Sequence, residues 1–160
     1  MDNLAGITIM NTVSQANTQC ECGACKLTLS HAPKGRFFCH CEICQKVYKK
    51  PYSDVSVMDA QSVSIAEGSP IEYTSYWSGL KRGTCKECGQ PVVALLTQFP
   101  LLKIAFVPTN TIDSSLQVPD SQAHIFYHRR VSDMDDNLPK VSGFIKSELK
   151  ATGIILPALT

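Results

Sequence analysis

Several features that would assign a protein class directly are missing from this sequence. No apolar run in the 160 residues approaches the roughly 18 residues that a membrane span needs. The acidic start, residues 1–4, has no basic region followed by an apolar stretch, so we expect no secretory signal. Fifteen basic and fourteen acidic residues leave a formal charge of +1, which disfavours a nucleic-acid-binding domain. We therefore expect a cytoplasmic protein with neither membrane nor nucleic-acid partners.

Other familiar signatures of organisation and catalysis are also lacking. The chain has no internal repeat, no low-complexity tract and no linker long enough to separate two domains. It shows no Ser–His–Asp order, no phosphate-binding glycine loop and no paired-carboxylate arrangement. Hydrophobic residues make up 44% of the chain and charged residues only 18%. This is enough apolar material for the core of one domain, so a disordered chain is excluded.

The hydrophobic pattern indicates a mainly antiparallel β domain. Alternation with period two, or short continuous apolar runs, predicts strands at Lys26–Leu29, Val55–Val57, Val63–Ile65, Ile71–Tyr73, Pro91–Leu96, Leu101–Val107 and His124–Arg130, with a possible edge strand at Ile7–Met10. Turn signals such as Gly68-Ser69-Pro70 separate them. One short helix is predicted at Cys41–Lys50, ended by Pro51, and a second at Ser142–Lys150.

Cysteine is the informative residue. The eight cysteines all lie between Cys20 and Cys88. They form three groups: Cys20-x-Cys22-x-x-Cys25, Cys39-His40-Cys41-x-x-Cys44, and Cys85-x-x-Cys88-Gly89. In a Cys-x-x-Cys turn two sulfurs reach one tetrahedral ion, and a following glycine supplies the positive φ that such a turn often needs. Three such pairs are a strong signal for zinc.

Two alternatives use the same residues. Four disulfides would require an oxidising compartment, for which the sequence has no export signal. Iron–sulfur clusters are also held by grouped thiolates. Zinc is favoured over both, and seven or eight thiolates suffice for two ions. With two zinc ions on seven thiolates the formal charge becomes +1 − 7 + 4 = −2, which disfavours nucleic acid further.

One of the two sites is expected to have only three protein ligands. Structural zinc has four, whereas catalytic zinc keeps one position open. Cys39, Cys41 and Cys44 are the best candidates for the open site because they are close in sequence and two of them begin a predicted helix, whose N-terminus favours thiolate. Three thiolates make zinc a soft centre that suits an incoming thiol. Such a thiol would ionise readily and attack an aldehyde carbon.

The ordered motifs resemble a known family. The run Cys20-x-Cys22-Gly23-Ala24, then Cys39-His40-Cys41-x-x-Cys44, then Gly83-x-Cys85-x-x-Cys88-Gly89-x-Pro91 is similar to the glutathione-dependent formaldehyde-activating enzymes, a family that includes the domain of centromere protein V. The motifs cover roughly residues 18–92. The segment His124–Pro139 resembles the family's closing strand and its Asp-x-Leu-Pro sequence.

The resemblance implies a fold and a ligand set. The fold would be mainly β, an Mss4-like β-tent of antiparallel sheets pinned by zinc, with one or two short helices. We expect an N-terminal extension at 1–17, the zinc domain at 18–140 and a C-terminal extension at 141–160 packed on it. Cys20, Cys22, Cys85 and Cys88 would hold a structural zinc, and Cys39, Cys41 and Cys44 a catalytic one. Cys25 replaces a usually aliphatic family residue, so we favour a buried thiol over an extra ligand.

The resemblance also implies an activity. The protein would be a zinc-dependent carbon–sulfur lyase acting on thiol–aldehyde adducts, similar to S-(hydroxymethyl)glutathione synthase, with glutathione and formaldehyde as partners. The alternative is a non-catalytic, zinc-stabilised binding module with both sites saturated. A chromatin-associated module is disfavoured by the near-neutral charge. The sequence leaves the oligomeric state open.

Further side chains are candidates for supporting roles. Cations near the open site could bind glutathione carboxylates, and the candidates are Arg36, Lys46, Lys49, Lys50, Arg129 and Arg130. His40 could shuttle protons, but strand alternation points it away from the metal, which favours a structural role. Tyr76 and Trp77 could line a pocket, although packing is favoured. Asp133, Asp135 and Asp136 are interpreted as a solvated acidic turn.

Overall fold

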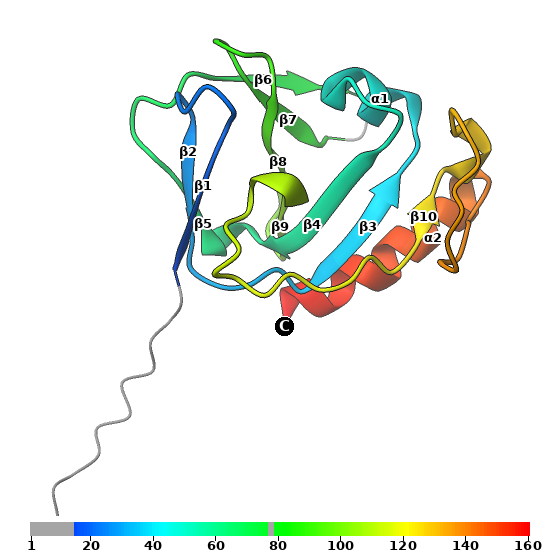
Figure 1. Cartoon of the computed structure of the whole chain (residues 1–160). Helices are drawn as coiled ribbons and strands as arrows, with labels where there is room; N and C mark the ends of the chain where they lie inside the picture. Colours follow the sequence, from blue (N-terminus) through cyan, green and yellow to red (C-terminus); the bar gives the residue numbers. More distant parts are fainter. Residues whose placement is uncertain (1–14, 77–78) are drawn as a thin grey trace, which may run out of the picture.

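The structure is a computed structural model that describes residues 15–76 and 79–160. It is mainly β, as the sequence predicts, with two sheets and one long helix (Figure 1). The strands are β1 (Ala16–Gln19), β2 (Lys26–Leu29), β3 (Gly35–Cys39), β4 (Ser53–Asp59), β5 (Val63–Ile65), β6 (Ile71–Ser75), β7 (Lys81–Cys85), β8 (Pro91–Phe99), β9 (Leu102–Pro108) and β10 (His124–Ile125). The α-helices are α1 (Glu42–Tyr48) and α2 (Phe144–Ile155), and short 3-10 turns cover Ala60–Ser62, Thr109–Thr111, Tyr127–Arg129 and Leu156–Leu159.

The strands form a small sheet and a large one. The small sheet has the order β1-β2-β5, and the large sheet has the order β10-β3-β4-β9-β8-β7-β6. Neighbouring strands are antiparallel, except that the short β10 runs parallel to β3. Antiparallel neighbours joined by short turns keep most of the pairing local, so β6, β7, β8 and β9 follow one another in space as they do in sequence.

The large sheet is covered on both faces. On one face, Met58, Ala105 and Val93 pack with Leu27 and Leu29 of the small sheet in one buried core. A second buried core lies on the other face, where strand residues pack against α2 and the turn that follows it; it contains Phe37, Val55, Val57, Ile104, Ala151, Ile154 and Ala158. Apart from the exposed Cys22, each metal-ligand candidate therefore belongs to one of two separate cores.

Helix α2 approaches β3 closely because residue 35 is a glycine. A Cβ atom on Gly35 would lie 2.8 Å from Cγ2 and 3.0 Å from the carbonyl oxygen of Ile154. No side chain fits this space without a shift of the helix. The predicted second helix, Ser142–Lys150, is therefore longer and later than expected: it runs from Phe144 to Ile155 because its last turn is held against the sheet.

Three other expectations need correction or lie outside the description. The predicted strand His124–Arg130 ends at Ile125, because Phe126 has a left-handed backbone with φ of 52° and a 3-10 turn follows. Helix α1 begins one residue after Cys41, which is its N-cap, and ends at Tyr48, before a left-handed Lys49. The edge strand proposed at Ile7–Met10 lies outside the described residues. No helix of the described part is long and apolar enough to cross a membrane.

Candidate functional site

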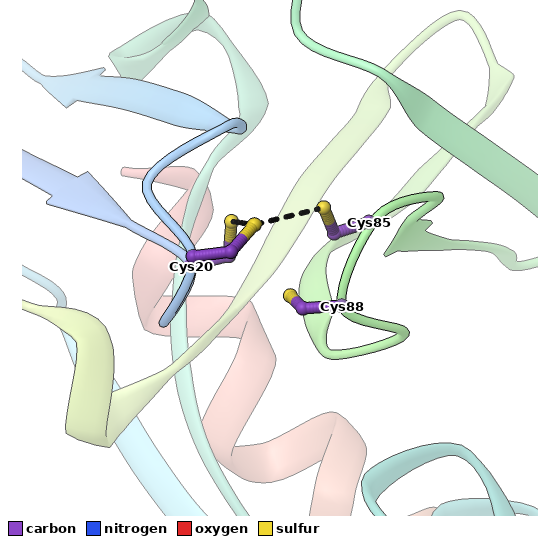
Figure 2. Close-up of side chains that lie close together, drawn as sticks. Cys20, Cys85 and Cys88 are labelled. Carbon is purple, nitrogen blue, oxygen red and sulfur yellow. Dashed lines mark hydrogen bonds between the residues drawn. The ribbon is translucent and has the colours of Figure 1, made fainter.

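Four cysteines from two distant turns meet at one point. Cys20 and Cys22 lie in the turn after β1, and Cys85 and Cys88 lie at the end of β7 and in the turn after it. Their sulfur atoms all lie within 4.8 Å of one another. The Sγ atoms of Cys20 and Cys22 are 3.4 Å apart, and those of Cys22 and Cys85 are 3.7 Å apart (Figure 2). We call Cys20, Cys22, Cys85 and Cys88 the four-cysteine cluster.

Backbone turns aim these thiols at each other. The amide of Gly89 donates to the carbonyl oxygen of Cys85 at 2.8 Å, and the amide of Cys85 donates to Gln90 at 2.8 Å. Gly89 has a φ of 72°, the positive value expected from the sequence. In the other turn, the amide of Cys25 donates to the sulfur of Cys20 at 3.3 Å. The two bonds around Cys85 fix the shape of its turn, and the Cys25 amide supplies a donor to sulfur, which stabilises a thiolate.

The four-cysteine cluster fits a tetrahedral metal ion. With Zn–S bonds of about 2.3 Å, the edges of a tetrahedron are about 3.8 Å, close to the two short distances above. Burial opposes ionisation of Cys85, but the backbone amides of Cys88 and Glu87 lower its pKa to about 6. The amide of Ala24 favours the Cys22 thiolate, but the neighbouring thiol of Cys20, burial, and the thiols of Cys88 and Cys85 together outweigh it and raise the pKa of Cys22 to about 12. The set ionises fully only with a cation among the sulfurs.

Cys25 lies beside this cluster and outside the second one. Its side chain is fully buried, and its thiol donates to the carbonyl oxygen of Pro70 at 3.6 Å. Burial, followed by the neighbouring Cys85, raises its pKa to about 12. All eight cysteines are free, so the structure contains no disulfide. The position of Cys25 in the core between the sheets matches a small buried hydrophobe and cannot complete the distant three-thiol site.

The second cluster forms where β3 meets α1. Cys39 is the last residue of β3 and is buried, Cys41 is the N-cap of α1, and Cys44 lies in the first turn of the helix. Their sulfur atoms lie within 4.8 Å of one another. The amide of Cys44 donates to the sulfur of Cys41 at 3.3 Å. We call Cys39, Cys41 and Cys44 the three-cysteine cluster; it offers three corners of a tetrahedron.

One thiol of the three-cysteine cluster carries the negative charge. Hydrogen bonds from the thiols of Cys39 and then Cys44 lower the pKa of Cys41 to about 3. The same contacts raise the pKa of Cys39 well above its usual range. A single thiolate thus suppresses ionisation of its neighbours, and a cation would relieve this repulsion. The donor set fits zinc as three thiolate ligands with one position left.

A cavity of about 490 Å³ opens beside the three-cysteine cluster. Cys39, Cys41 and Cys44 all line it, on the face of the large sheet that α2 covers. Apolar side chains make up most of the remaining wall, and they include Phe37, Phe106, Phe126 and Ile155. The size lies within the range of cavities that bind small organic molecules. The four-cysteine cluster does not line this cavity, so of the two clusters it is the three-cysteine cluster that this cavity exposes to a ligand.

The comparisons with known proteins agree with this arrangement. The sequence pattern of the family described as glutathione-dependent formaldehyde-activating enzyme matches residues 15–129, well over half of the chain. The chain belongs to this family. A crystal structure of a Rhodobacter sphaeroides protein is similar with a TM-score of 0.51 and 14% sequence identity, over 61% of this chain and 88% of that one. At that identity the likeness supports the fold alone. No curated protein sequence matches the chain significantly.

Membership of the formaldehyde-activating family supports a function related to glutathione and formaldehyde. Among the cations expected at the site, only Arg129 lines the cavity, and it pairs with Glu42 at 3.2 Å. Arg36 instead makes a two-pronged pair with Asp54, at 2.8 and 2.7 Å, and Arg130 pairs with Asp133. Lys46, Lys49 and Lys50 do not line the cavity.

Arg82 is the cavity cation that sequence reasoning missed. It lies on β7, and its guanidinium carbon is 5.4 Å from the ring centre of Tyr76. In the sequence Lys81-Arg82-Gly83-Thr84-Cys85, only strand alternation distinguishes the side of Arg82 from that of Lys81. The sequence does not predict a strand at Lys81–Cys85, so this distinction could not be made. Tyr76 therefore supports a cavity residue, while Trp77 lies outside the described residues.

His40 belongs to a buried network. Its Nε2 and the Nδ1 of His124 share a hydrogen bond of 2.8 Å, and the Nε2 of His124 donates to Asp136 at 2.7 Å. Both imidazoles are buried, and His40 does not line the cavity. Burial, followed by His124, lowers the pKa of His40 to about 4. Asp136 also binds Lys140 at 2.9 Å, so it is a structural partner rather than a solvated turn residue.

Proposed function

We propose that this protein is a zinc-dependent carbon–sulfur lyase that forms and cleaves thiol–aldehyde adducts, with glutathione and formaldehyde as the expected pair. The observation that carries the proposal is the three-cysteine cluster in the wall of a cavity of about 490 Å³. A site that only stabilised the fold would have four protein ligands and no need of a cavity. The thiolate sites also suit the reducing conditions of the cytoplasm.

The two cysteine clusters and the apolar wall would have different roles in the reaction. Cys39, Cys41 and Cys44 would hold the zinc, and Cys20, Cys22, Cys85 and Cys88 would hold a second, structural zinc. Zinc bound in the cavity wall would supply a Lewis acid that favours the thiolate form of an incoming thiol. The apolar wall excludes water around the reacting sulfur and holds thiol and aldehyde together, which by itself accelerates addition.

We assign the proton transfer to Glu148. It lies on α2 and lines the cavity. Although it is exposed overall, burial of its carboxyl, followed by the charge of Cys41, raises its pKa. In adduct formation the thiol loses a proton, its sulfur bonds to the carbonyl carbon, and the carbonyl oxygen gains a proton. Glu148 would accept the first proton and return it to the oxygen, and the reverse sequence would cleave the carbon–sulfur bond.

The test is the exchange rate between formaldehyde and S-(hydroxymethyl)glutathione, measured by magnetisation-transfer NMR with zinc-loaded protein. We expect exchange faster than the spontaneous rate, a return to the spontaneous rate in Cys41→Ala, and retained exchange in the matched variant Cys25→Ala. Because Cys25 is a buried thiol outside both clusters, it controls for the loss of one cysteine. A zinc-loaded protein that leaves the rate unchanged would overturn the proposal in favour of a binding module.

A further inference from the structure

The cavity is more apolar than formaldehyde and a charged thiol such as glutathione require. Formaldehyde has two heavy atoms, whereas the wall presents large apolar groups that include Phe37, Phe106 and Phe126. Apolar surface that stays in contact with water gives no binding energy, so walls of this kind favour a ligand with its own apolar part. The wall includes residues of the large sheet and residues of α2, such as Ile155.

Within this wall, Arg82 is a cation with an unused donor. Its Nη1 is buried and has no hydrogen-bond partner among residues 15–76 and 79–160. Buried nitrogen donors of this kind are normally satisfied, so an unpartnered one points to a ligand acceptor. The guanidinium carbon lies 5.4 Å from the ring centre of Tyr76, a cation–π contact that does not use the hydrogen-bonding capacity of Nη1.

The strand register places the Arg82 side chain on the face of the large sheet that lines the cavity. Arg82 pairs with Ala94 across β7 and β8, and Ala94 pairs with Phe106 across β8 and β9. Directly paired residues project from the same face of a sheet, so the three side chains form one row. All three line the same cavity as the three-cysteine cluster.

The other charged groups of the cavity are less suited to bind an anion. Arg129 is exposed and already paired with Glu42. Glu148 has the wrong sign. In the described part of the chain, no carboxylate forms an ion pair with Arg82 within the distance that defines the other pairs. A carboxylate on the ligand would therefore be the natural partner of Arg82.

We propose that the cavity selects adducts of an anionic thiol with a bulky apolar aldehyde, in which Arg82 binds a carboxylate of the thiol and the apolar wall holds the aldehyde's hydrocarbon chain. This rests on the proposed function, because it names the substrate class of the same site. Formaldehyde is then the smallest member of the series and leaves the apolar wall unfilled.

Binding of S-alkylglutathiones tests this without any turnover. These thioethers carry glutathione's carboxylates and an alkyl chain but no thiol, so their affinity reports on the cavity rather than on catalysis. With zinc-loaded protein and isothermal calorimetry, we expect S-hexylglutathione to bind at least about tenfold more tightly than S-methylglutathione, since each buried methylene is worth up to about fourfold. We expect Arg82→Gln to weaken both ligands by about tenfold or more.

Two further variants make the result specific. Arg82→Lys keeps the charge without the planar fork and should lose only part of the affinity. Lys81→Gln removes the same charge from an exposed neighbour on β7 that does not line the cavity, and should bind like the wild type. Equal affinity for the two ligands, or wild-type binding by Arg82→Gln, would overturn the inference. If the zinc-loaded wild-type protein does not accelerate formaldehyde exchange but the S-alkylglutathione affinities are as expected, only the proposed function is refuted.

Discussion

Replacing Cys85 by alanine should unfold the protein, whereas the same change at Cys25 should only weaken it. Both thiols are essentially fully buried, at 1% and 0% exposure, and both belong to the core between the two sheets. They differ in one respect: the sulfur of Cys85 belongs to the four-cysteine cluster, and that of Cys25 does not.

The two losses differ in size by nearly an order of magnitude. Cys25→Ala removes one buried sulfur and leaves a small cavity, a cost of about 1–2 kcal/mol. For a domain of this size, that lowers Tm by about 2–8 °C. Cys85→Ala removes one ligand of an ion whose binding contributes about 10–16 kcal/mol in zinc-finger peptides. This is comparable to the whole unfolding free energy of a domain, about 5–15 kcal/mol.

The assay combines zinc content per chain with urea unfolding followed by circular dichroism. Cys25→Ala should retain two zinc ions and a cooperative transition. Cys85→Ala should lose at least one ion and show a much weaker transition or none. Equal zinc content and equal stability in the two variants would refute the assignment of Cys85 as a ligand, and loss of zinc from Cys25→Ala would make that residue a ligand instead.

Three further predictions follow from the same structure. Gly35→Ala should cost about 1–3 kcal/mol because its Cβ would lie 2.8 Å from Ile154, and a thermal melt that matches the wild type would contradict the close approach of α2. Lys140 and then His124 hold the pKa of Asp136 well below its usual 3.8, so this carboxylate stabilises the fold above about pH 4 and the contribution is lost as pH falls further. Asp136→Asn should therefore be less stable than the wild type at pH 7, with a difference in urea midpoint that shrinks in acid; a constant difference would exclude the ion pairing. A competing chelator should remove the zinc of the three-cysteine cluster first, as two kinetic phases in a zinc-indicator assay, because that cluster opens to the cavity; a single phase that releases both ions would contradict this order.

Where apolar alternation is strong, sequence and structure agree. Lys26–Leu29 and Val63–Ile65 are strands with the predicted ends, and Val55–Val57 and Pro91–Leu96 lie inside longer ones. Ala16–Gln19 and Lys81–Cys85 escaped prediction because they are polar or charged in sequence. These segments are strands because their neighbours supply the hydrogen bonds, which is information that local composition does not carry.

The sequence also predicts only part of the candidate site. The Cys-x-x-Cys spacing indicates metal ligands, and it singles out Cys39, Cys41 and Cys44 as neighbours. The meeting of Cys20 with Cys85 across 65 residues came only from the family resemblance, because spacing gives no long-range contacts. Arg82 could not be predicted from the sequence for a related reason. Its role depends on which face of β7 lies against the cavity, and the pairing of β7 with β6 and β8 determines that face.

The most direct test of an open three-thiolate site is the absorption spectrum of protein in which cobalt(II) replaces zinc. Glutathione should change the thiolate-to-cobalt bands because its sulfur would take the fourth position, whereas S-methylglutathione should not. The four-cysteine cluster contributes a constant background, since its ligand set is complete. A spectrum that glutathione leaves unchanged would show that both sites are closed, and would contradict a catalytic role for the three-cysteine cluster.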